Sequence, residues 1–472
     1  MLAKIRQPLC VVHVANNCSR RGSGAANFGL QCQHAGFRSV SYFHDLHLGN
    51  RSIATFGCRC SNVKLPVASQ GRLMATTVEV SGEEEVECEI MDEYLRKEID
   101  TYAAMEPHPC SVAEILGMRE PQVLARFIHH EVPIRYAERI RDIEEIPDWQ
   151  YNEDLLEMHS HHVDVFQNIR LMQKTDDDHY EKLGSMSEPN VLGSFNDIVL
   201  QAQRMGAGLP FQATRAMKIL HDNDGERYTT QFADRWLDDF LLNWIGTTTL
   251  LGQYIACAQG HSNGIIDPDL DVSEVCKGIA TTIQEMCAGI YGRRPHIVVE
   301  SFSAVEADER APHFSYIPQF LQFIMQEALK NCARATLDTC PIEKLPKRPT
   351  TIAVCADEQQ VAIRISDRGR GIPFHVGDKI WSYMYSTGCK TKPVHGDYGE
   401  GPTPLVGYGC GLPLSRLYCR YLGGWMRVVS WPGYGVDVHL WMPRVSDQQI
   451  EVVPDRDLTE REPAYDPFIN RK

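Results

Sequence analysis

The change of hydrophobic period near residue 265 constrains the fold of this chain more than any other feature of its sequence. From about residue 86 to 260, apolar side chains recur at helical spacing, and the longest such stretch is Gln231 to Ala258. Farther on, Thr351–Ala356 and Gln360–Ser366 alternate apolar and polar residues on either side of a short turn, as in a hairpin. Helices followed by antiparallel strands predict an α+β fold, in which an antiparallel helical bundle precedes one sheet covered by helices.

The same patterns predict the other elements. Ser111 and Glu114 have the spacing of a capping box that opens a helix, and Pro121 suits the first turn of the next one. The remaining predicted elements are helices at Met91–Ala104, Leu155–Met172, Ile198–Met205, Val272–Ile290, Gln319–Thr336 and Pro413–Tyr421, and strands at His296–Glu300, Trp425–Trp431 and Gly435–Met442.

Length and composition exclude several classes of protein. At 472 residues the chain is longer than one ordinary domain, and its net charge of -15 argues against a nucleic-acid partner. No apolar run approaches the length of a membrane span. The 16 cysteines include no Cys-x-x-Cys pair, so they indicate reduced, buried thiols, and we predict no metal site built from them.

Residues 1–78 differ in composition from everything that follows. They contain nine Lys or Arg residues but a single acid, Asp45, and they are rich in Ser, Gly, Ala and Asn. This composition is typical of a mitochondrial transit peptide, and the alternative is a disordered basic tail. We therefore expect four parts: the transit or disordered segment 1–78, a helical bundle at 86–262, a second domain at 265–445, and an acidic tail at 446–472.

The predicted helix at Gln319–Thr336 carries an unusual polar stripe. Its members, at positions i, i+3, i+4 and i+7, are Glu327, Lys330, Asn331 and Arg334. Carboxylate or amide oxygens suit Mg²⁺, cations neutralise phosphates, and a carboxylate can accept a proton. The stripe thus suits a triphosphate and its metal, although alone it is equally compatible with a solvated helix face.

Glycine-rich motifs follow at two places. Asp367-Arg-Gly-Arg-Gly371 ends a predicted strand, where a carboxylate can accept from an amine while the glycine backbone approaches a flat ring; an ordinary hairpin turn has a similar composition. The second motif, ahead of a helix, exposes backbone N–H groups to an anion, and its members are Gly407, Tyr408, Gly409, Cys410, Gly411 and Leu412. Ser386 and Thr387, between the two motifs, supply hydroxyls for a base or a phosphate.

In this order, Glu-x-x-Lys-Asn-x-x-Arg-Ala-Thr, Asp-Arg-Gly-x-Gly, Ser-Thr and Gly-Tyr-Gly-x-Gly-Leu-Pro resemble the ATP-binding domain shared by gyrase, Hsp90, histidine kinases and MutL. That superfamily is called GHKL, and its fold is the Bergerat α/β sandwich. The Lys and Arg around Asn331 resemble, more narrowly, the mitochondrial kinases of pyruvate and branched-chain dehydrogenase complexes. The resemblance runs from about Ile99 to Met442 and includes Leu237-Asp-Asp-Phe240 and Gly433-Tyr-Gly-Val-Asp437.

The resemblance implies a role for each motif. Asn331 would bind Mg²⁺, Glu327 would act as general base, and Lys330 and Arg334 would flank the phosphates of ATP. Asp367 would accept from the adenine amine, with Gly371 and Thr387 near the base, and Ser386 would also contact ATP. The glycine-rich segment 407–412 would close over the phosphates. Phosphoryl transfer needs mainly positioning and charge neutralisation, so this set is chemically sufficient.

The resemblance also implies a cellular setting. Such a kinase would lie in the mitochondrial matrix, use ATP and Mg²⁺, with K⁺ as a further candidate ion, and phosphorylate a serine of the E1 alpha component of a 2-oxoacid dehydrogenase complex, which inhibits the complex. Its bundle would dock the lipoyl domain of the E2 acyltransferase core, and the family forms homodimers. No nucleic acid and no membrane span are expected.

Three positions depart from the family pattern. Tyr254 replaces a usual histidine and Thr248 a usual arginine, while Phe323 stands where the pyruvate-directed kinases have a histidine. Phe323 and its aromatic surroundings are closer to the branched-chain kinase, so we expect a branched-chain substrate in preference to pyruvate dehydrogenase. The alternatives are a catalytically silent ATP-binding regulator, which Tyr254 and Thr248 would suit, and a GHKL-type ATPase.

Overall fold

The computed structural model describes residues 12–14, 30–32, 82–171, 189–303, 313–357, 360–386 and 409–444. The chain divides into two compact units, residues 1–79 and 80–472. In the first unit, the short strands β1 (Val12–Val14) and β2 (Leu30–Cys32) pair antiparallel. The rest of the predicted transit segment and the acidic tail lie outside the described residues.

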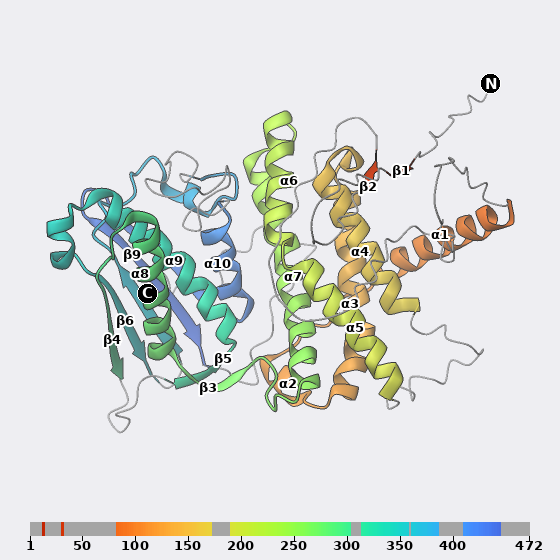
Figure 1. Cartoon of the computed structure of the whole chain (residues 1–472), viewed down its shortest axis with the longest axis horizontal. Coiled ribbons are helices and arrows are strands. Elements are labelled where there is room, and N and C mark those ends of the chain that lie inside the picture. The colour runs from red at the N-terminus through yellow and green to blue at the C-terminus, as the bar shows by residue number, and fades with distance from the viewer. Residues whose placement is uncertain are drawn as a thin grey trace, which may run out of the picture. The chain divides into compact units, whose positions relative to one another are not determined.

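In the second unit, the secondary-structure elements described before residue 262 are all helices (Figure 1). Their helices are α1 (Gly82–Ala103), α2 (Val112–Gly117), α3 (Pro121–Glu144), α4 (Glu153–Leu171), α5 (Pro189–Gly206), α6 (Leu209–Asn223) and α7 (Thr230–Ala258), with a 3₁₀ turn, η1 (Trp149–Tyr151), before α4. Helix α3 packs against α1, α4 and α7, which gives the predicted bundle.

Local signals explain where several helices begin. The capping box is confirmed, since Ser111 Oγ accepts from Glu114 N at 3.0 Å and Glu114 returns a bond to Ser111 N. Pro121 lies in the first turn of α3, as predicted. Helix α6 was missed, because Gly206, Gly208 and Pro210 resemble a break in the sequence. In the structure Pro210 instead occupies the first turn of α6, where its missing N–H costs nothing.

Charged and polar side chains are buried where α3 meets α7. Asn243 Nδ2 donates to Glu138 Oε2 at 2.6 Å, and the Arg139 guanidinium lies 4.4 Å above the ring of Tyr136. All four of these residues are at least nine-tenths buried. Burial disfavours the charged form of a carboxylate and raises its pKa. Asp142 of α3 shows this effect.

We expect Asp142→Asn, on α3, to stabilise the protein at high pH. Burial raises the pKa of Asp142 to about 8, and the neighbouring carboxylates of Glu138 and Glu145 add to the shift. The unfolded chain releases this proton near pH 4, so above that pH the folded state binds more protons and its stability falls until about pH 8. In thermal unfolding, the variant should gain roughly 1–3 kcal/mol near pH 9 and almost nothing near pH 4. An equal gain at both pH values would contradict this assignment.

Five strands after residue 290 form one sheet in the order β4-β6-β7-β9-β8. Their bounds are β4 (Ile297–Ser303), β6 (Thr350–Ala356), β7 (Gln360–Ser366), β8 (Trp425–Trp431) and β9 (Gly435–Pro443). The predicted β6–β7 hairpin and β8–β9 pair are both antiparallel, as expected. The expectation of antiparallel strands alone is wrong for β4, which pairs with β6 in parallel. The helix between these two strands brings the chain back to the end of the sheet where β4 began.

Three helices pack on this sheet, and Figure 1 shows them on one face of it. Helix α8 (Val272–Tyr291) packs on β4 and β6, α9 (Pro318–Thr339) on β7, and α10 (Gly411–Tyr421) on β8 and β9. Between them, fully or almost fully buried side chains such as Ile352, Ile363 and Leu440 form the core. A two-stranded ribbon of β3 (Asp267–Asp271) and β5 (His313–Tyr316) precedes α9. The fold is therefore the predicted α+β sandwich.

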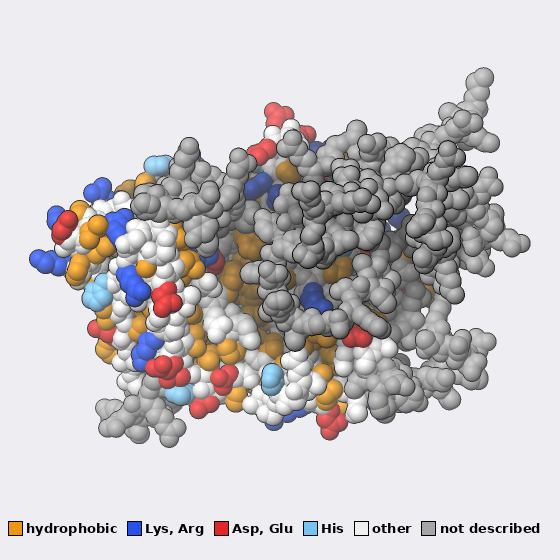
Figure 2. All heavy atoms as spheres, in the orientation of Figure 1, with side chains coloured by type: hydrophobic (Ala, Val, Ile, Leu, Met, Phe, Trp, Pro, Cys, Tyr) orange, Lys and Arg blue, Asp and Glu red, His pale blue; other side chains and the backbone are white. Residues whose placement is uncertain are grey.

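The charged surface and the membrane-spanning potential of the helices can be described for the residues that the structure covers. On the face shown in Figure 2, Lys and Arg side chains alternate with Asp and Glu over the sheet-bearing part of the chain, and the described residues show no continuous basic patch there. Among the helices that the structure describes, none combines the length and apolar character required to cross a membrane.

Candidate functional site

The polar stripe of α9 lies beside a cavity of about 320 Å³ in the sheet-bearing part of the chain. Glu327, Asn331 and Arg334 all line it, because the helical period turns the three side chains to the same side. Lys330 does not line the cavity but forms an ion pair with Glu327, which is 16% exposed. On the opposite stripe, Leu321 and Met325 are fully buried against the sheet.

Asp367 reaches the cavity from the end of β7. It is 2% exposed, and its backbone N–H donates to the carbonyl of Val436 at 2.9 Å. The carboxylate accepts from Gly369 N at 2.7 Å and from the Cys332 thiol of α9. Burial raises the pKa of Asp367, and these two hydrogen bonds offset part of the rise. One strand end and one helix face therefore hold a carboxylate at the wall of the cavity.

Glycines are required around Asp367 because the backbone comes very close to other backbone. Gly371 has a φ of 73°, and a Cβ there would overlap the carbonyl oxygen of Trp431. A Cβ on Gly435 would likewise overlap the carbonyl oxygen of Asp367. The segment Asp367–Gly371 thus packs on the segment Trp431–Gly435, and the two together shape the cavity wall next to Asp367.

The glycine-rich segment before α10 closes the other side of the cavity. Gly409, Gly411 and Leu412 line it, and α10 begins at Gly411, so its first backbone N–H groups lie at the cavity. A Cβ on Gly411 would overlap the carboxylate oxygen Oε2 of Glu327. The N-terminus of α10 therefore lies directly against the acid of α9, which is a suitable place for an anion.

The segment 382–386, with Tyr385 and Ser386 in the cavity wall, is held by the bundle. Asp234 of α7 accepts from Ser382 Oγ at 3.0 Å and from Tyr383 N at 2.9 Å. One turn later, Asp238 accepts from Tyr383 OH at 2.9 Å. Burial raises the pKa of both aspartates. Asp234 and, from the Leu237-Asp-Asp-Phe240 motif, Asp238 thus hold this part of the cavity wall against α7.

Cys410 and Lys218 extend the site toward the bundle. Cys410 is 1% exposed and caps α10; burial and the nearby Glu327 carboxylate raise its pKa to about 11, while Lys218 lowers it. Lys218 is on α6, and its Nζ would be 3.2 Å from a Cβ built on Gly409. Sequence reasoning missed Lys218, since it lies on a helix that was not predicted and far from every motif.

We expect Lys218→Met to weaken ATP binding by roughly three- to tenfold, the effect of removing one partly solvated cation near a phosphate-binding loop. The measurement is the Kd of ATP from fluorescence or calorimetry. Lys277→Met, which removes an exposed lysine paired with Glu274 on α8, is the matched control. An unchanged Kd in Lys218→Met would show that this lysine only packs on the loop.

The cavity fits a nucleotide with a divalent cation. Its volume is within the usual range of ligand pockets. One part of its wall is apolar, with Ile372, Val428 and Val438, which suits a flat base next to the Asp367 carboxylate. The other part offers oxygen atoms of Glu327 and Asn331, which are the kind of ligand that Mg²⁺ prefers. The donor set therefore suits Mg²⁺ with a triphosphate.

The structure thus brings together most of the predicted site residues. Those that line the cavity are Glu327, Asn331, Arg334, Asp367, Gly371, Ser386, Gly409, Gly411 and Leu412. Lys330 and Cys410 lie immediately behind the lining, where each approaches Glu327. Thr387, Gly407 and Tyr408 lie outside the described residues, so their predicted roles stay predictions.

Two family models match the chain. The model described as histidine kinase-, DNA gyrase B-, and HSP90-like ATPase matches residues 316–446, which contain the whole cavity-lining set. The model described as mitochondrial branched-chain alpha-ketoacid dehydrogenase kinase matches residues 118–276, from α3 to α8. The branched-chain kinase model thus matches the helical bundle, and the ATPase model matches the sheet-bearing part that follows it in the chain.

Relatives extend over both parts. The chain is 26% identical to a mitochondrial pyruvate dehydrogenase (acetyl-transferring) kinase of Drosophila melanogaster, over 76% of this chain and 87% of the relative. It is 27% identical to the human mitochondrial isozyme 3 of that kinase, over 76% and 88%, and to human isozyme 4, over 76% and 86%. The chain therefore belongs to the mitochondrial kinase family that includes the pyruvate and branched-chain α-ketoacid dehydrogenase kinases, within the GHKL superfamily.

Proposed function

We propose that this protein is a mitochondrial serine/threonine protein kinase that transfers phosphate from Mg-ATP to the E1 alpha component of a 2-oxoacid dehydrogenase complex and thereby inhibits the complex. The observation that carries the proposal is the single cavity wall formed by Glu327 and Asn331 of α9, by Asp367 just after β7, and by Gly409 and Gly411 around the start of α10. Each of these groups comes from a different motif, and together they match the chemistry of phosphoryl transfer.

In this proposal each side chain has one task. Asp367 accepts a hydrogen bond from the exocyclic amine of adenine, and the amide oxygen of Asn331 would hold Mg²⁺, which would supply positive charge next to the phosphates. Glu327 accepts the proton of the acceptor hydroxyl as that oxygen bonds to the γ-phosphorus of ATP, while the bond from this phosphorus to the bridging oxygen breaks and ADP leaves. Its ion pair with Lys330 holds the Glu327 carboxylate in position beside the cavity. The N–H groups at the start of α10 and the Arg334 guanidinium stabilise the charge on the transferred group.

The substrate that we propose is the branched-chain dehydrogenase in preference to pyruvate dehydrogenase. Phe323, four residues before Glu327, packs against the ring of Tyr418 at 5.0 Å between centroids. An aromatic side chain here cannot supply the imidazole that pyruvate-directed kinases carry, so the base lacks that polar neighbour. The relatives named above are pyruvate dehydrogenase kinases, whereas the model matching the bundle is described by the branched-chain enzyme. The acceptor must therefore be determined by experiment.

The setting that we propose is the mitochondrial matrix. The relatives are named mitochondrial, and residues 1–78 have the composition of a transit peptide. Within the complex, the helical bundle would bind the lipoyl domain of E2, and the kinase would act as a homodimer. K⁺ remains a candidate ion next to Mg²⁺. The proposed domain boundaries at 78, 86–262 and 265–445 serve as starting points for truncated variants.

A catalytically silent regulator is the second candidate, because Tyr254 and Thr248 replace family residues. Tyr254, however, is fully buried in the bundle, where its ring packs on Phe195 at 5.2 Å. Thr248 donates to the Trp244 carbonyl of its own helix at 2.9 Å. Neither residue lines the cavity, so both substitutions are compatible with intact transfer chemistry. A GHKL-type ATPase would instead hydrolyse ATP steadily without any protein acceptor.

The test is phosphate transfer from labelled ATP to purified branched-chain and pyruvate dehydrogenase components, assayed side by side, with Asn331→Ala as control. Label on the branched-chain component alone, absent in the variant, is the expected result. Label on pyruvate dehydrogenase alone would keep the kinase and reverse the substrate. ATP binding without label on either component would support the regulator, and steady hydrolysis without label would support the ATPase.

A further inference from the structure

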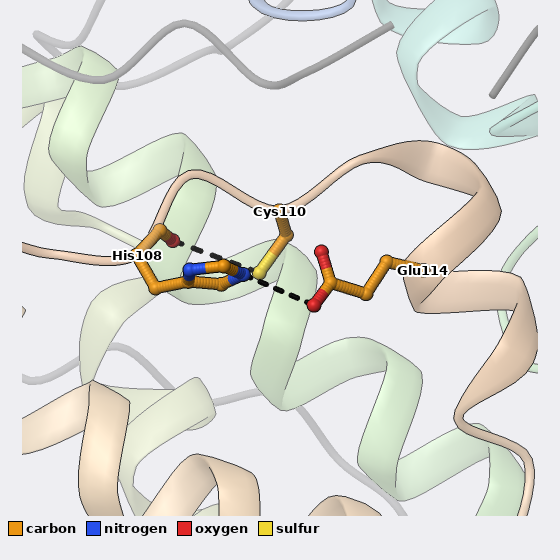
Figure 3. Close-up of side chains that lie close together, drawn as sticks. All are labelled: His108, Cys110 and Glu114. Atoms are coloured by element: carbon orange, nitrogen blue, oxygen red, sulfur yellow. Dashed lines mark hydrogen bonds and ion pairs between the residues drawn. The ribbon is translucent and has the colours of Figure 1, made fainter. Parts of the chain in front are cut away.

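Three different metal-ligating side chains meet at the start of the bundle, away from the nucleotide cavity. They are His108 and Cys110, in the segment between α1 and α2, and Glu114 in the first turn of α2 (Figure 3). One ligand atom from each lies within 4.8 Å of the others. Figure 3 shows the Cys110 sulfur beside the His108 ring, with the Glu114 carboxylate directed at the same ring.

The backbone of His108 is held by a buried ion pair of α3. His108 N donates to Glu131 Oε1 at 3.0 Å, and the His108 carbonyl accepts from Arg135 Nη2 at 3.0 Å. Glu131 and Arg135 bond to each other at 2.9 Å, and their side chains are 2% and 1% exposed. The His108 ring also meets the edge of Phe127 at 6.1 Å. An irregular segment is thus held in place before any ligand binds.

Glu114 is oriented by the capping box of α2. One carboxylate oxygen, Oε2, accepts from Ser111 N at 3.4 Å, and the other, Oε1, lies 3.0 Å from His108 Nε2. The helix cap therefore uses one oxygen and directs the other to the imidazole. Because the cap determines this direction, Oε1 is available to a cation at the ring with little loss of conformational entropy.

Cys110 completes the set from the buried side. The residue is fully buried, and its thiol donates a long hydrogen bond of 3.7 Å to the His108 carbonyl. His108 and Glu114 are exposed, so solvent reaches the group from their side. A cation could enter there, with the thiolate at the base of the site and a water molecule in the fourth position.

We propose that His108, Cys110 and Glu114 form a binding site for a divalent transition-metal ion of the zinc type. Imidazole nitrogen, thiolate sulfur and carboxylate oxygen are all ligands that Zn²⁺ accepts, whereas Mg²⁺ and Ca²⁺ prefer oxygen. Around tetrahedral Zn²⁺ such ligand atoms are about 3.3–3.6 Å apart, so the observed group needs only small side-chain shifts. Binding forms the metal–sulfur bond as the Cys110 thiol loses its proton to solvent.

A metal at this position would join the α1–α2 segment to α2 and, through the backbone bonds of His108, to α3. Because the ion binds only the folded state, it would stabilise the bundle in proportion to its concentration. This role does not depend on the phosphotransfer reaction. The competing explanation is a helix cap with a His108–Glu114 ion pair and an inert buried thiol beside it.

The experiment uses the purified full-length chain, stripped of metal and titrated with Co²⁺ or Zn²⁺ without nucleotide. We expect one equivalent of Co²⁺ to produce a thiolate-to-cobalt charge-transfer band, and Zn²⁺ to abolish it. The band should be absent in Cys110→Ser and remain in Cys276→Ser, a matched change at another fully buried cysteine. Zn²⁺ should also raise the Tm of the wild type but not of Cys110→Ser.

Glu114→Gln provides a second variant, because glutamine at this position of a capping box preserves the helix start. It removes the charged ligand, and we expect its affinity for Co²⁺ to fall at least about tenfold while its circular dichroism is unchanged. Absence of the band in the wild type would overturn the proposal. A band of equal strength in Cys110→Ser, or unchanged affinity in Glu114→Gln, would assign the metal to other residues and would overturn it as well.

Discussion

The Glu327→Gln variant should bind ATP with nearly unchanged affinity and transfer phosphate about 10²–10⁴ times more slowly than the wild type, the usual contribution of a well-placed general base. Glutamine has the same shape as glutamate but cannot accept the proton of the acceptor hydroxyl. The effect should be confined to kcat, because Glu327 adjoins Lys330 and Gly411, where we propose that the phosphates bind, whereas Asp367 is the residue proposed to bind the base.

Single-turnover transfer to the dehydrogenase component measures this rate, and calorimetry measures the Kd of ATP. Glu343→Gln is the matched control, because Glu343 is an exposed acid of the 3₁₀ turn Ile342–Lys347 and is absent from the cavity lining. If Glu327→Gln transfers phosphate as fast as the wild type, Glu327 is not the base. If neither the wild type nor Glu327→Gln transfers phosphate, the protein is better described as a catalytically silent ATP-binding regulator.

The Asp367→Asn variant should lose about one to two orders of magnitude in ATP affinity. A hydrogen bond to a charged acceptor contributes roughly 1.5–3 kcal/mol, and a neutral amide offers the adenine amine a weaker acceptor. Stability should not fall, since burial raises the pKa of Asp367 and a neutral residue avoids the cost of burying charge. Loss of affinity with an unchanged Tm therefore separates ligand recognition from folding.

If Asp367 binds adenine as proposed, the same carboxylate should give ATP binding a pH dependence. Since the pKa of Asp367 is raised, it takes up a proton at a higher pH than an ordinary aspartate, and ATP affinity should decrease as the pH falls through that raised value. In Asp367→Asn this part of the dependence should disappear. Asp437→Asn is the control, since Asp437 accepts from Ser366 on the adjacent strand and is absent from the cavity lining. The same pH profile in wild type and Asp367→Asn would rule out this residue as the adenine acceptor.

The contacts between α7 and the cavity wall show how the bundle can influence the nucleotide. Asp234 and Asp238 accept hydrogen bonds from Ser382 and Tyr383. Tyr385 and Ser386 of the same segment line the cavity. Asp238 also lies 3.6 Å from Arg416 of α10, the helix whose first turn lies beside Glu327. A shift of α7 would therefore reach both the wall and the base, which gives the helical half of the protein a physical route to the reaction.

Much of the site could be predicted from the sequence because its signals are local. The stripe of α9 follows from helical spacing alone, and Glu327, Asn331 and Arg334 line the cavity together. The strand that ends before Asp367 and the helix that begins at Gly411 were also expected within about two residues. In each case the residues that decide the outcome are neighbours along the chain, so their pattern is visible without a structure.

The sequence alone determined the α+β class, most of the helix and strand segments, and the chemical types gathered in each motif, because these depend on spacing within a few residues. Only the tertiary structure decided that β4 pairs parallel with β6, that Lys218 reaches Gly409, and that α3 holds His108 beside Cys110 and Glu114. Such contacts join segments far apart in the chain. They depend on how buried faces pack against one another, and no local pattern records which face meets which.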